Sequence, residues 1–356
     1  MGCNYFEYKD KIAFHPGYYI EEIIQDMNIT QEDFAKRLQT TPKNISKLIN
    51  GEQSLSDDIA MKLARMFDTS VEYWLNHQKS YDALLAQKAS DDELENEREV
   101  FQYIDYRYIA SMFHLPEYTR DVDKQIEATR KVLKVSTLSV LKNADLAVNF
   151  KSSNGKKSEA NIIRANVMVQ IACNQALQVN APKFNKALFQ RKIEYALTLT
   201  KQHDSFFSVL EKSFLEAGVI LIFLPNLKGS KVNGATKYIN RNNIMLMIND
   251  RGTNSDIFWF TLFHEIGHIM NSDLGISFEN EIGEKEEKAN EFAQNALIPS
   301  LEYQSFVKRG DFSENAIIEF SSLIDRDPGL VLGRLQKDKY VNYDSYHHLH
   351  HKYRLN

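Results

Sequence analysis

The sequence is poor in cysteine, in glycine-rich loops and in long apolar runs. Two cysteines in 356 residues suit a reducing compartment and exclude a disulfide framework. No GxGxxG or Walker-type loop occurs, so nucleotide binding is not expected. The longest apolar run, VILIFL, is far too short to span a bilayer, and the first ten residues do not have the pattern of a secretory signal. We therefore expect a cytoplasmic protein with no membrane partner.

The charge of the chain limits how it could bind nucleic acid. The net charge is −5, so the chain is not a polycation, and any nucleic-acid binding must come from a local patch. A length of 356 residues exceeds the usual size of one compact domain. We expect a predominantly helical α+β chain in three parts: a five-helix domain at 1–82, a helical connecting region at 83–204 and a C-terminal domain at 205–356.

Residues 17–77 are predicted to form short helices, each with its own start signal. Thr30 and Ser56 precede apolar residues at helical spacing, and Thr41 is followed by Pro42 at the first helical position. The last of these helices is expected to be short and to end near residue 78.

The segment that follows, KASDDELENERE at 88–99, has almost no apolar residues. It fits a solvated linker or the start of an exposed helix. Further helices are expected at 100–150, 160–177 and 184–199, from their apolar spacing.

Two of the N-terminal helices, at 31–38 and 42–50, have the spacing of a helix-turn-helix. Residues 1–80 hold nine basic and twelve acidic residues, so positive charge is only local, around the turn. Spacing alone also fits a small helical bundle with no role on DNA. If the pair does bind DNA, the contacts are expected from polar side chains near the two helix starts: Gln31, Thr41, Lys43, Asn44 and Lys47.

Longer sequence patterns favour the DNA-binding interpretation. HPG at 15–17 is followed by TQEDFAKRL, ISKLINGEQSLS and EYWLNHQ. Over residues 14–82 the segment resembles the HigA-type antitoxins, which are Xre-family helix-turn-helix regulators of toxin–antitoxin operons. The resemblance implies operator DNA as a partner and a cognate toxin or repressor protein as a second one. A homodimer is expected because one helix-turn-helix reads only a half-site.

The pattern of the chain changes after about residue 205. A helix ends at Gly218, and VILIFLP reads as a strand bounded by proline. ATKYIN at 235–240 and NIMLMIND at 243–250 read as a pair of strands. A helix carrying FTLFHEIGHIMN follows, and helices complete the chain.

The HExxH pattern at 264–268 predicts a zinc site. On a helix His264 and His268 lie one turn apart on the same face, where two imidazoles can hold one ion. The ion lowers the pKa of a water molecule, and Glu265 is placed to accept its proton. The surrounding helix is apolar nearly all round, so these polar groups need a partner when buried, and a metal supplies one.

The third ligand is expected from an acid on the helix at 283–299. Glu286 is the favoured ligand and Glu287 the alternative, and Asn290 is expected to orient a histidine. At least one of the acids Glu284, Glu286 and Glu287 is expected to be only a solvated residue in the first helical turn, where the helix dipole favours negative charge.

FWFTLFHEIGHIMN together with EEKANEFAQNALIP resembles the ImmA/IrrE family of zinc metallopeptidases, over residues 205–300. The resemblance implies a zinc endopeptidase of the kind that cleaves helix-turn-helix repressors. The substrate could be the chain itself, the DNA-binding domain of a neighbouring copy, or another protein. The two resemblances together imply a DNA-binding transcriptional regulator of the antitoxin type that carries a zinc metallopeptidase-like domain. Two alternatives stay open: an endopeptidase that DNA binding only localises, and a sensor that does not cut.

Three further features are expected to be structural. Tyr238 and His203 are available to stabilise an oxyanion, but an ordinary structural role is favoured for each. The histidine-rich segment YDSYHHLHHKY at 343–353 is expected to be an exposed terminal segment. Cys173 lies in an apolar helix and is expected in the core.

Overall fold

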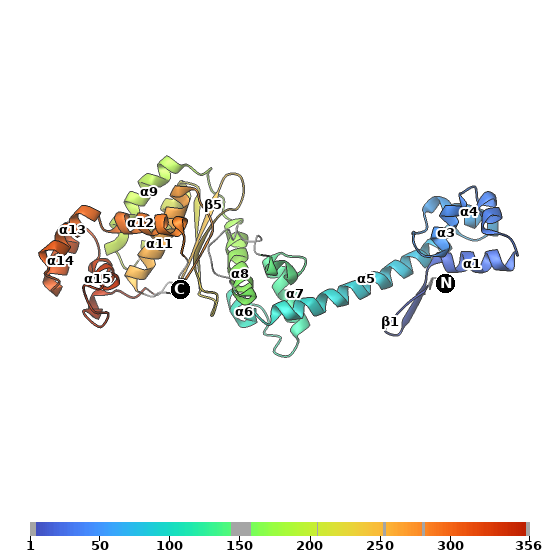
Figure 1. Cartoon of the computed structure of the whole chain (residues 1–356), viewed down its shortest axis with the longest axis horizontal. Coiled ribbons are helices and arrows are strands. Elements are labelled where there is room, and N and C mark those ends of the chain that lie inside the picture. The colour runs from blue at the N-terminus through green and yellow to red at the C-terminus, as the bar shows by residue number, and fades with distance from the viewer. Residues whose placement is uncertain (1–4, 144–157, 205, 252–253, 280–281, 354–356) are drawn as a thin grey trace. The chain divides into compact units, whose positions relative to one another are not determined.

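The computed structural model describes residues 5–143, 158–204, 206–251, 254–279 and 282–353. Chain contacts divide it into two compact units, Met1–Asn96 and Glu97–Asn356. The predicted α+β class with a predominance of helix is confirmed: a two-stranded hairpin and a four-stranded sheet accompany many helices (Figure 1). Within these ranges no helix is both long and apolar enough to cross a bilayer. The division into three parts at residues 82 and 204 stays a prediction.

The first unit is built from helices that begin where the sequence predicts. The hydroxyls of Thr30, Thr41 and Ser56 each accept a hydrogen bond from a backbone N–H in the first turn of the helix that they precede. The helices enclose a core of large apolar side chains that includes Phe34 and Trp74. Their bounds are α1 Pro16–Asp26, α2 Gln31–Arg37, α3 Pro42–Ile49, α4 Asp57–Phe67 and α5 Val71–Phe101.

The fifth helix differs from the prediction, because it does not end near residue 78. It continues through the charged segment at 88–99 as far as Phe101. That segment has neither glycine nor proline, and it is rich in good helix formers. A pair one turn apart, Lys88 and Asp92 at 2.7 Å, adds local support.

A β-hairpin at the start of the first unit was not predicted. It consists of β1 Tyr5–Tyr8 and β2 Lys11–Phe14. Its turn contacts the same charged part of α5: Tyr8 Oη and Lys9 Nζ donate to Asp91 Oδ2 at 2.8 and 2.5 Å. The charged stretch is therefore a helical surface with a partner, and the term linker does not describe it.

The HPG motif brings two helices into backbone contact. His15 is buried and accepts a hydrogen bond from the Gly17 N–H through Nδ1 at 3.0 Å, and its burial lowers the pKa of the imidazole. A Cβ on Gly17 would lie 1.8 Å from the carbonyl oxygen of Leu48 in α3. Only glycine therefore permits this spacing of α1 and α3.

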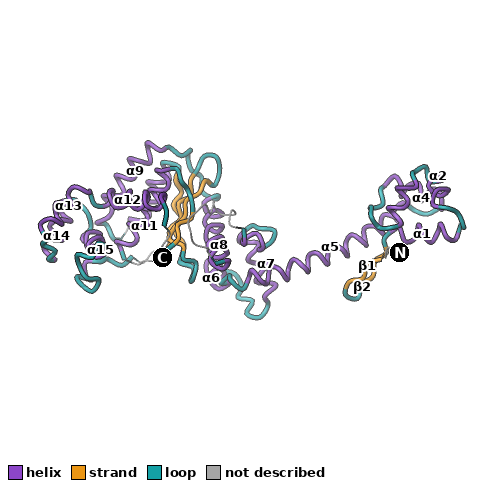
Figure 2. The backbone as a smooth tube through the Cα atoms, in the orientation of Figure 1, coloured by secondary structure: helices purple, strands orange, loops and turns teal. Residues whose placement is uncertain are grey.

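The sheet in the second unit has the strand order β3-β5-β4-β6. The predicted pairing of β4 with β5 is confirmed and is antiparallel, whereas the parallel pairing of β3 with β5 and the short strand β6 were not predicted. Helix α8 covers one face, and α11 lies on the other with α12 beyond it (Figures 1 and 2). The bounds are β3 Val219–Leu224, β4 Val232–Tyr238, β5 Ile244–Asn249, β6 Ile276–Phe278, α8 Glu159–Ala176, α11 Ser255–Asn271 and α12 Glu284–Leu297.

The remaining helices surround these layers. The helices expected at 160–177 and 184–199 are present, and Cys173 is buried in α8 as predicted. The expected helices at 100–150 are present as far as residue 142, and residues 144–150 lie outside the described part. The bounds are α6 Tyr106–Phe113, α7 Val122–Leu133, η1 Leu138–Lys142, α9 Lys186–Thr198, η2 Leu199–Lys201, α10 Phe206–Glu216, α13 Ser300–Arg309, α14 Glu314–Leu323, α15 Pro328–Lys337 and η3 His347–Leu349.

The prediction of an exposed C-terminal segment is wrong for Tyr353, whereas His351 and Lys352 beside it are exposed. Tyr353 is buried, packs against Phe206 with ring centroids 4.6 Å apart and planes tilted by 41°, and accepts a hydrogen bond from Trp259 Nε1 at 3.0 Å. The backbone carbonyl of His351 accepts from the N–H of Ser255 at 2.8 Å. The first N–H groups of a helix have no partner within it, so the start of α11 offers donors to this tail.

We predict that Gly17→Ala opens the contact between α1 and α3. The added Cβ meets a backbone carbonyl that cannot turn away, so the change should destabilise this unit by about 1–3 kcal/mol. Hydrogen–deuterium exchange of the whole chain should show faster exchange in both helices. Ser80→Ala, at an exposed site in α5, is the matched control. Unchanged protection in Gly17→Ala would contradict the close contact.

Candidate metal centre

Helix α11 is almost entirely buried. Phe258, Trp259, Leu262 and Phe263 are among its core residues. It packs against α12, and a Cβ on Gly267 would lie 3.0 Å from the Cα of Ala289. This close approach brings the first turns of α12 alongside the HExxH segment.

Three ligand atoms converge between these helices. His264 is 8% exposed and His268 is 3% exposed. Their Nε2 atoms are 3.1 Å apart. Glu286 places Oε2 3.1 Å from His264 Nε2 and Oε1 3.4 Å from His268 Nε2. Together the three side chains form a group that could hold one metal ion.

Each histidine is oriented by an oxygen on its other side. His264 Nδ1 lies 3.0 Å from Asn290 Oδ1, and His268 Nδ1 lies 3.1 Å from Asp273 Oδ1. Because these oxygens accept hydrogen bonds, they favour the tautomer with hydrogen on Nδ1, which leaves Nε2 as the ligand atom. Sequence reasoning missed Asp273. Its only signal was a carboxylate just beyond the helix end, where Ser272 has φ 60° and the chain turns back.

The electrostatics of the group favour a cation. Although burial favours a neutral carboxyl, hydrogen bonds from His264 and His268 lower the pKa of Glu286 to about 2. Burial likewise disfavours a charged imidazole, yet Glu286, then Glu265 and Asp273, raise the pKa of His268 to about 9. A proton on His268 therefore supplies the positive charge that a metal ion would supply between the same side chains.

Glu265 is fully buried, and neither of its carboxylate oxygens has a hydrogen-bond partner within the described part of the chain. Burial raises its pKa; His268 and His264 act against this, as does Ser277, which lies nearby without reaching hydrogen-bond geometry. A Cβ on Gly234 of β4 would lie 2.6 Å from the Glu265 side chain. The strand therefore has to carry glycine here, a requirement that sequence reasoning missed.

The residues fit a divalent metal. Two imidazole nitrogens and one carboxylate are a donor set that catalytic zinc sites use, with a further position left for water. The carboxylate of Glu265, buried without a hydrogen-bond partner beside this set, gains a partner when water and a metal are present. The donor set and the orphaned carboxylate thus agree on the same interpretation.

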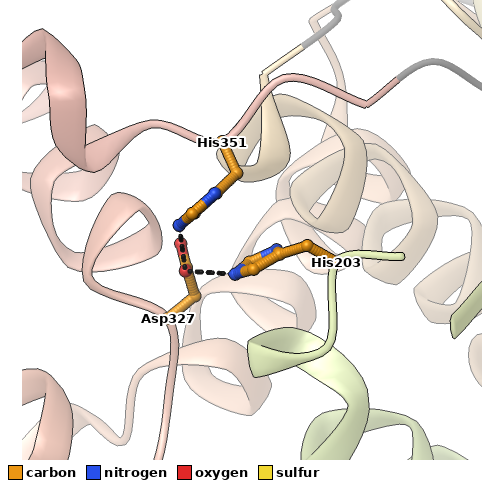
Figure 3. Close-up of side chains that lie close together, drawn as sticks. All are labelled: His203, Asp327 and His351. Carbon is orange, nitrogen blue, oxygen red and sulfur yellow. Dashed lines mark ion pairs between the residues drawn. The ribbon is translucent and has the colours of Figure 1, made fainter. Parts of the chain in front are cut away.

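The other predicted site residues lie elsewhere. Glu287 is exposed, whereas its neighbour Glu286 is the acid beside the histidines. Tyr238 is 54% exposed at the end of β4. His203 belongs to a different group with Asp327 and His351 (Figure 3). The roles predicted for all these residues stay predictions.

The helix-turn-helix presents a polar face around the start of α3. Lys43 and Lys47 are exposed, as is Gln31 at the start of α2. Thr41 caps α3 by accepting from the Asn44 N–H at 3.2 Å. The Asn44 amide is engaged within the chain, because it donates to Thr40 Oγ1 at 2.9 Å and accepts from Gln53. The two lysines are thus the side chains best placed for phosphate or base contacts.

Comparison with known families agrees with this arrangement. Residues 20–74 match the family described as Helix-turn-helix. Residues 219–315 match the M78 peptidase family, described as the IrrE N-terminal-like domain. The first match contains α2 and α3, and the second contains the whole HExxH helix and α12.

Individual relatives match the N-terminal part of the chain. The uncharacterized HTH-type transcriptional regulator YddM of Escherichia coli is 31% identical over 83 residues, which are 23% of this chain and 88% of that protein. Virulence-associated protein I of Dichelobacter nodosus is 31% identical over 77 residues, 21% of this chain and 71% of that protein. The structure of an addiction module antidote protein of the HigA family from Coxiella burnetii shares 33% identity, covers 23% of this chain and 91% of its own, and has a TM-score of 0.22.

We predict that Glu286→Ala weakens zinc binding at this site by about 100-fold or more, beyond the roughly 10–100-fold expected for the orienting residue in Asn290→Ala. Chelator competition on the purified chain measures both values. Glu287→Ala is the matched control and should leave the affinity unchanged. If Glu287→Ala loses the metal and Glu286→Ala keeps it, the ligand assignment is wrong.

We also predict that Lys43→Ala or Lys47→Ala weakens binding to DNA from the upstream region of its own gene. Loss of one phosphate contact should reduce the slope of log affinity against log salt by about 0.9. Gel-shift titrations at several salt concentrations measure it. Lys79→Ala, an exposed lysine of α5, controls for general charge. Affinity and slope unchanged in both variants would exclude this face.

Proposed function

The chain belongs to the helix-turn-helix family through its N-terminal residues and carries an IrrE N-terminal-like domain, and from this premise we propose a DNA-binding regulator that hydrolyses peptide bonds with zinc. The observation that carries the proposal is the fully buried carboxylate of Glu265, which has no hydrogen-bond partner among the described residues and lies beside the group His264, His268 and Glu286. Perturbed ionisable groups of this kind concentrate at reactive sites.

Each side chain of the site has a separate task in the proposed reaction. A zinc ion held by His264, His268 and Glu286 would supply Lewis acidity, which polarises a peptide carbonyl and acidifies a water molecule. Asn290 and Asp273 hold the hydrogens on the outer imidazole nitrogens. The Glu265 carboxylate takes the proton from the attacking water and returns it to the leaving amine. Its buried position beside the candidate ligands suits a group that passes a proton between water and the leaving amine.

A pocket of about 460 Å³ supports peptide binding next to this site. None of the candidate ligands lines it, but Phe260, one helical turn before His264, does, and the Phe260 and His264 rings lie 6.4 Å apart. Apolar residues such as Ile257 and Leu297 line it together with Arg334 and Lys337. The Lys337 ammonium lies over the Phe260 ring at 4.4 Å. Such a lining suits an apolar substrate side chain, with cations to receive a carboxylate or backbone carbonyl.

The N-terminal unit supports a role of this chemistry in gene control. The proposed partner is operator DNA, bound by a homodimer with one half-site for each helix-turn-helix. The proposed protein partner is a cognate toxin, by analogy with the antidote protein described above, or a repressor that is cut. The similarity covers 91% of the antidote protein but only 23% of this chain, so it does not extend to the C-terminal domain. As the substrate of that domain we favour a protein that carries a similar helix-turn-helix, which includes a second copy of this chain.

We predict that Glu265→Gln abolishes cleavage while zinc and DNA binding persist. A general base contributes about 10²–10⁴-fold to rate, and the amide keeps the size of the carboxyl without its basicity. Wild-type chain is incubated with zinc and a tagged Glu265→Gln copy as substrate, in parallel with a quenched-fluorescent peptide library, and products are identified by mass spectrometry. Glu291→Gln, an exposed change on α12, is the matched control.

The outcomes separate the alternatives. If the zinc-loaded wild type cuts neither substrate, the domain is a sensor that does not cut. If it cuts, but a promoter reporter in cells responds identically to wild type and Glu265→Gln, the helix-turn-helix only localises an endopeptidase. Cleavage at an unchanged rate by Glu265→Gln would exclude this residue as the base.

A further inference from the structure

A second group of ligand-type side chains lies near the N-terminal end of α11, and the proposed reaction does not use it. His203 follows η2, Asp327 precedes α15, and His351 belongs to the C-terminal segment. His203 Nε2 lies 3.3 Å from Asp327 Oδ2, and His351 Nε2 lies 3.9 Å from the same oxygen (Figure 3). We propose that these three residues bind a divalent transition metal such as zinc, which ties the C-terminal segment to the residues that follow η2 and precede α15.

The protein binds one carboxylate oxygen of Asp327, and the other oxygen is available to a metal. Its side chain is only 2% exposed. Oδ1 accepts from the Gly329 N–H at 2.9 Å and from the Ser255 hydroxyl at 3.4 Å, so the protein occupies that oxygen. Oδ2 faces the two imidazoles. A buried carboxylate needs a cation nearby, and a metal ion between Oδ2 and the two imidazoles would supply one.

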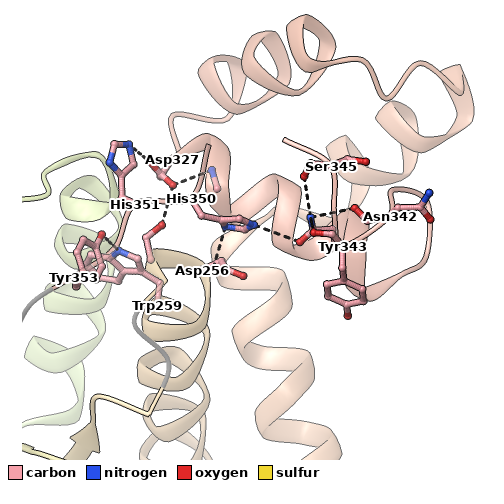
Figure 4. Close-up of polar contacts among 12 residues, drawn as sticks. Asp256, Trp259, Asp327, Asn342, Tyr343, Ser345, His350, His351 and Tyr353 are labelled. Atoms are coloured by element: carbon pink, nitrogen blue, oxygen red, sulfur yellow. Dashed lines mark hydrogen bonds and ion pairs between the residues drawn. The ribbon is translucent and has the colours of Figure 1, made fainter. Parts of the chain in front are cut away.

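The outer contacts of His203 also resemble those of a metal ligand. Its Nδ1 lies 3.3 Å from Tyr353 Oη. That oxygen accepts from Trp259 Nε1 at 3.0 Å (Figure 4). In the tautomer that a metal requires, Nδ1–H donates to Tyr353 and Nε2 is left as the ligand. Tyr353, which is itself held by Trp259, thus fixes the orientation of the His203 ring through the nitrogen that does not face Asp327.

Metal binding requires one change in the group. The rings of His203 and His351 are stacked, with centroids 3.6 Å apart and planes 18° apart, so their Nε2 lone pairs lie in two nearly parallel planes that do not meet at one point between the rings. Both cannot point at one ion until a ring rotates. The His351 side chain is 50% exposed, so it can rotate on its solvent side, where water can complete the coordination. A bound metal should therefore break the stack.

The second group is separate from the HExxH site. Ser255, which contacts Asp327, precedes His264 by nine residues, about 14 Å along a helix. The two sites can therefore be loaded and emptied independently. The same C-terminal segment contributes Tyr343 and His350 to the pocket near Phe260, and His350 pairs with Asp256 at 3.2 Å. An effect of the second metal on substrate binding would follow from this shared segment, and that consequence alone rests on the proposed function.

Metal counting tests the second site without measuring cleavage. The whole chain is dialysed against zinc, and bound metal is counted by mass spectrometry. We expect about two ions in the wild type, about one in His264→Ala/His268→Ala, and about one in His351→Ala. Combining the changes at both sites should leave none. His347→Ala, an exposed histidine of the same segment, is the matched control and should keep both ions.

A second variant and a spectrum guard against unfolding. Asp327→Asn should also lose one ion, and circular dichroism checks the fold of every variant. Cobalt(II) added to His264→Ala/His268→Ala should give visible absorption that disappears in the His351→Ala background. If the wild type binds one ion and His351→Ala still binds it, the second site does not exist. Two ions that survive both His351→Ala and Asp327→Asn would place the second ion elsewhere and overturn the assignment equally.

Discussion

The second unit depends on one constraint, which is that α11 must bury three ionisable side chains in an otherwise apolar helix. Removing such groups from water is unfavourable unless each finds a partner. His264 and His268 find theirs in Glu286 and in the oxygens of Asn290 and Asp273. Glu265 finds none among the described residues. The packing of α12 against α11 follows from this need, because it delivers the required carboxylate and amide.

The polar groups at the two ends of α11 find their partners in different ways. At its start the backbone donors are exposed to the C-terminal segment, which supplies a carbonyl and a buried tyrosine. Towards its end the side chains turn inward to a polar group between two helices. A single rigid helix thus connects a peripheral segment of the chain with the candidate metal centre. Movement of the one is transmitted to the other only as far as the helix itself shifts.

Local features were predictable from the sequence, and features that depend on distant packing were not. Thr30, Thr41 and Ser56 act within one helical turn, so their capping could be predicted. The HExxH spacing has the same local character. Gly234 matters only because β4 and α11 meet in space at Glu265, and Asp273 reaches His268 only because the chain turns back at Ser272. The extension of α5 was missed because charged composition suits both a solvated helix and a linker, and the docking of Tyr353 depends on Trp259, 94 residues away.

The residue at position 234 is informative when related sequences are compared. A glycine in the middle of a strand normally weakens it, so the position would be free to drift in any relative that no longer needs room for the Glu265 carboxylate. A side chain there would displace that carboxylate even when the HExxH letters are intact. Reading this strand position alongside the motif therefore offers a way to sort related sequences into those that can still place the acid and those that have lost it.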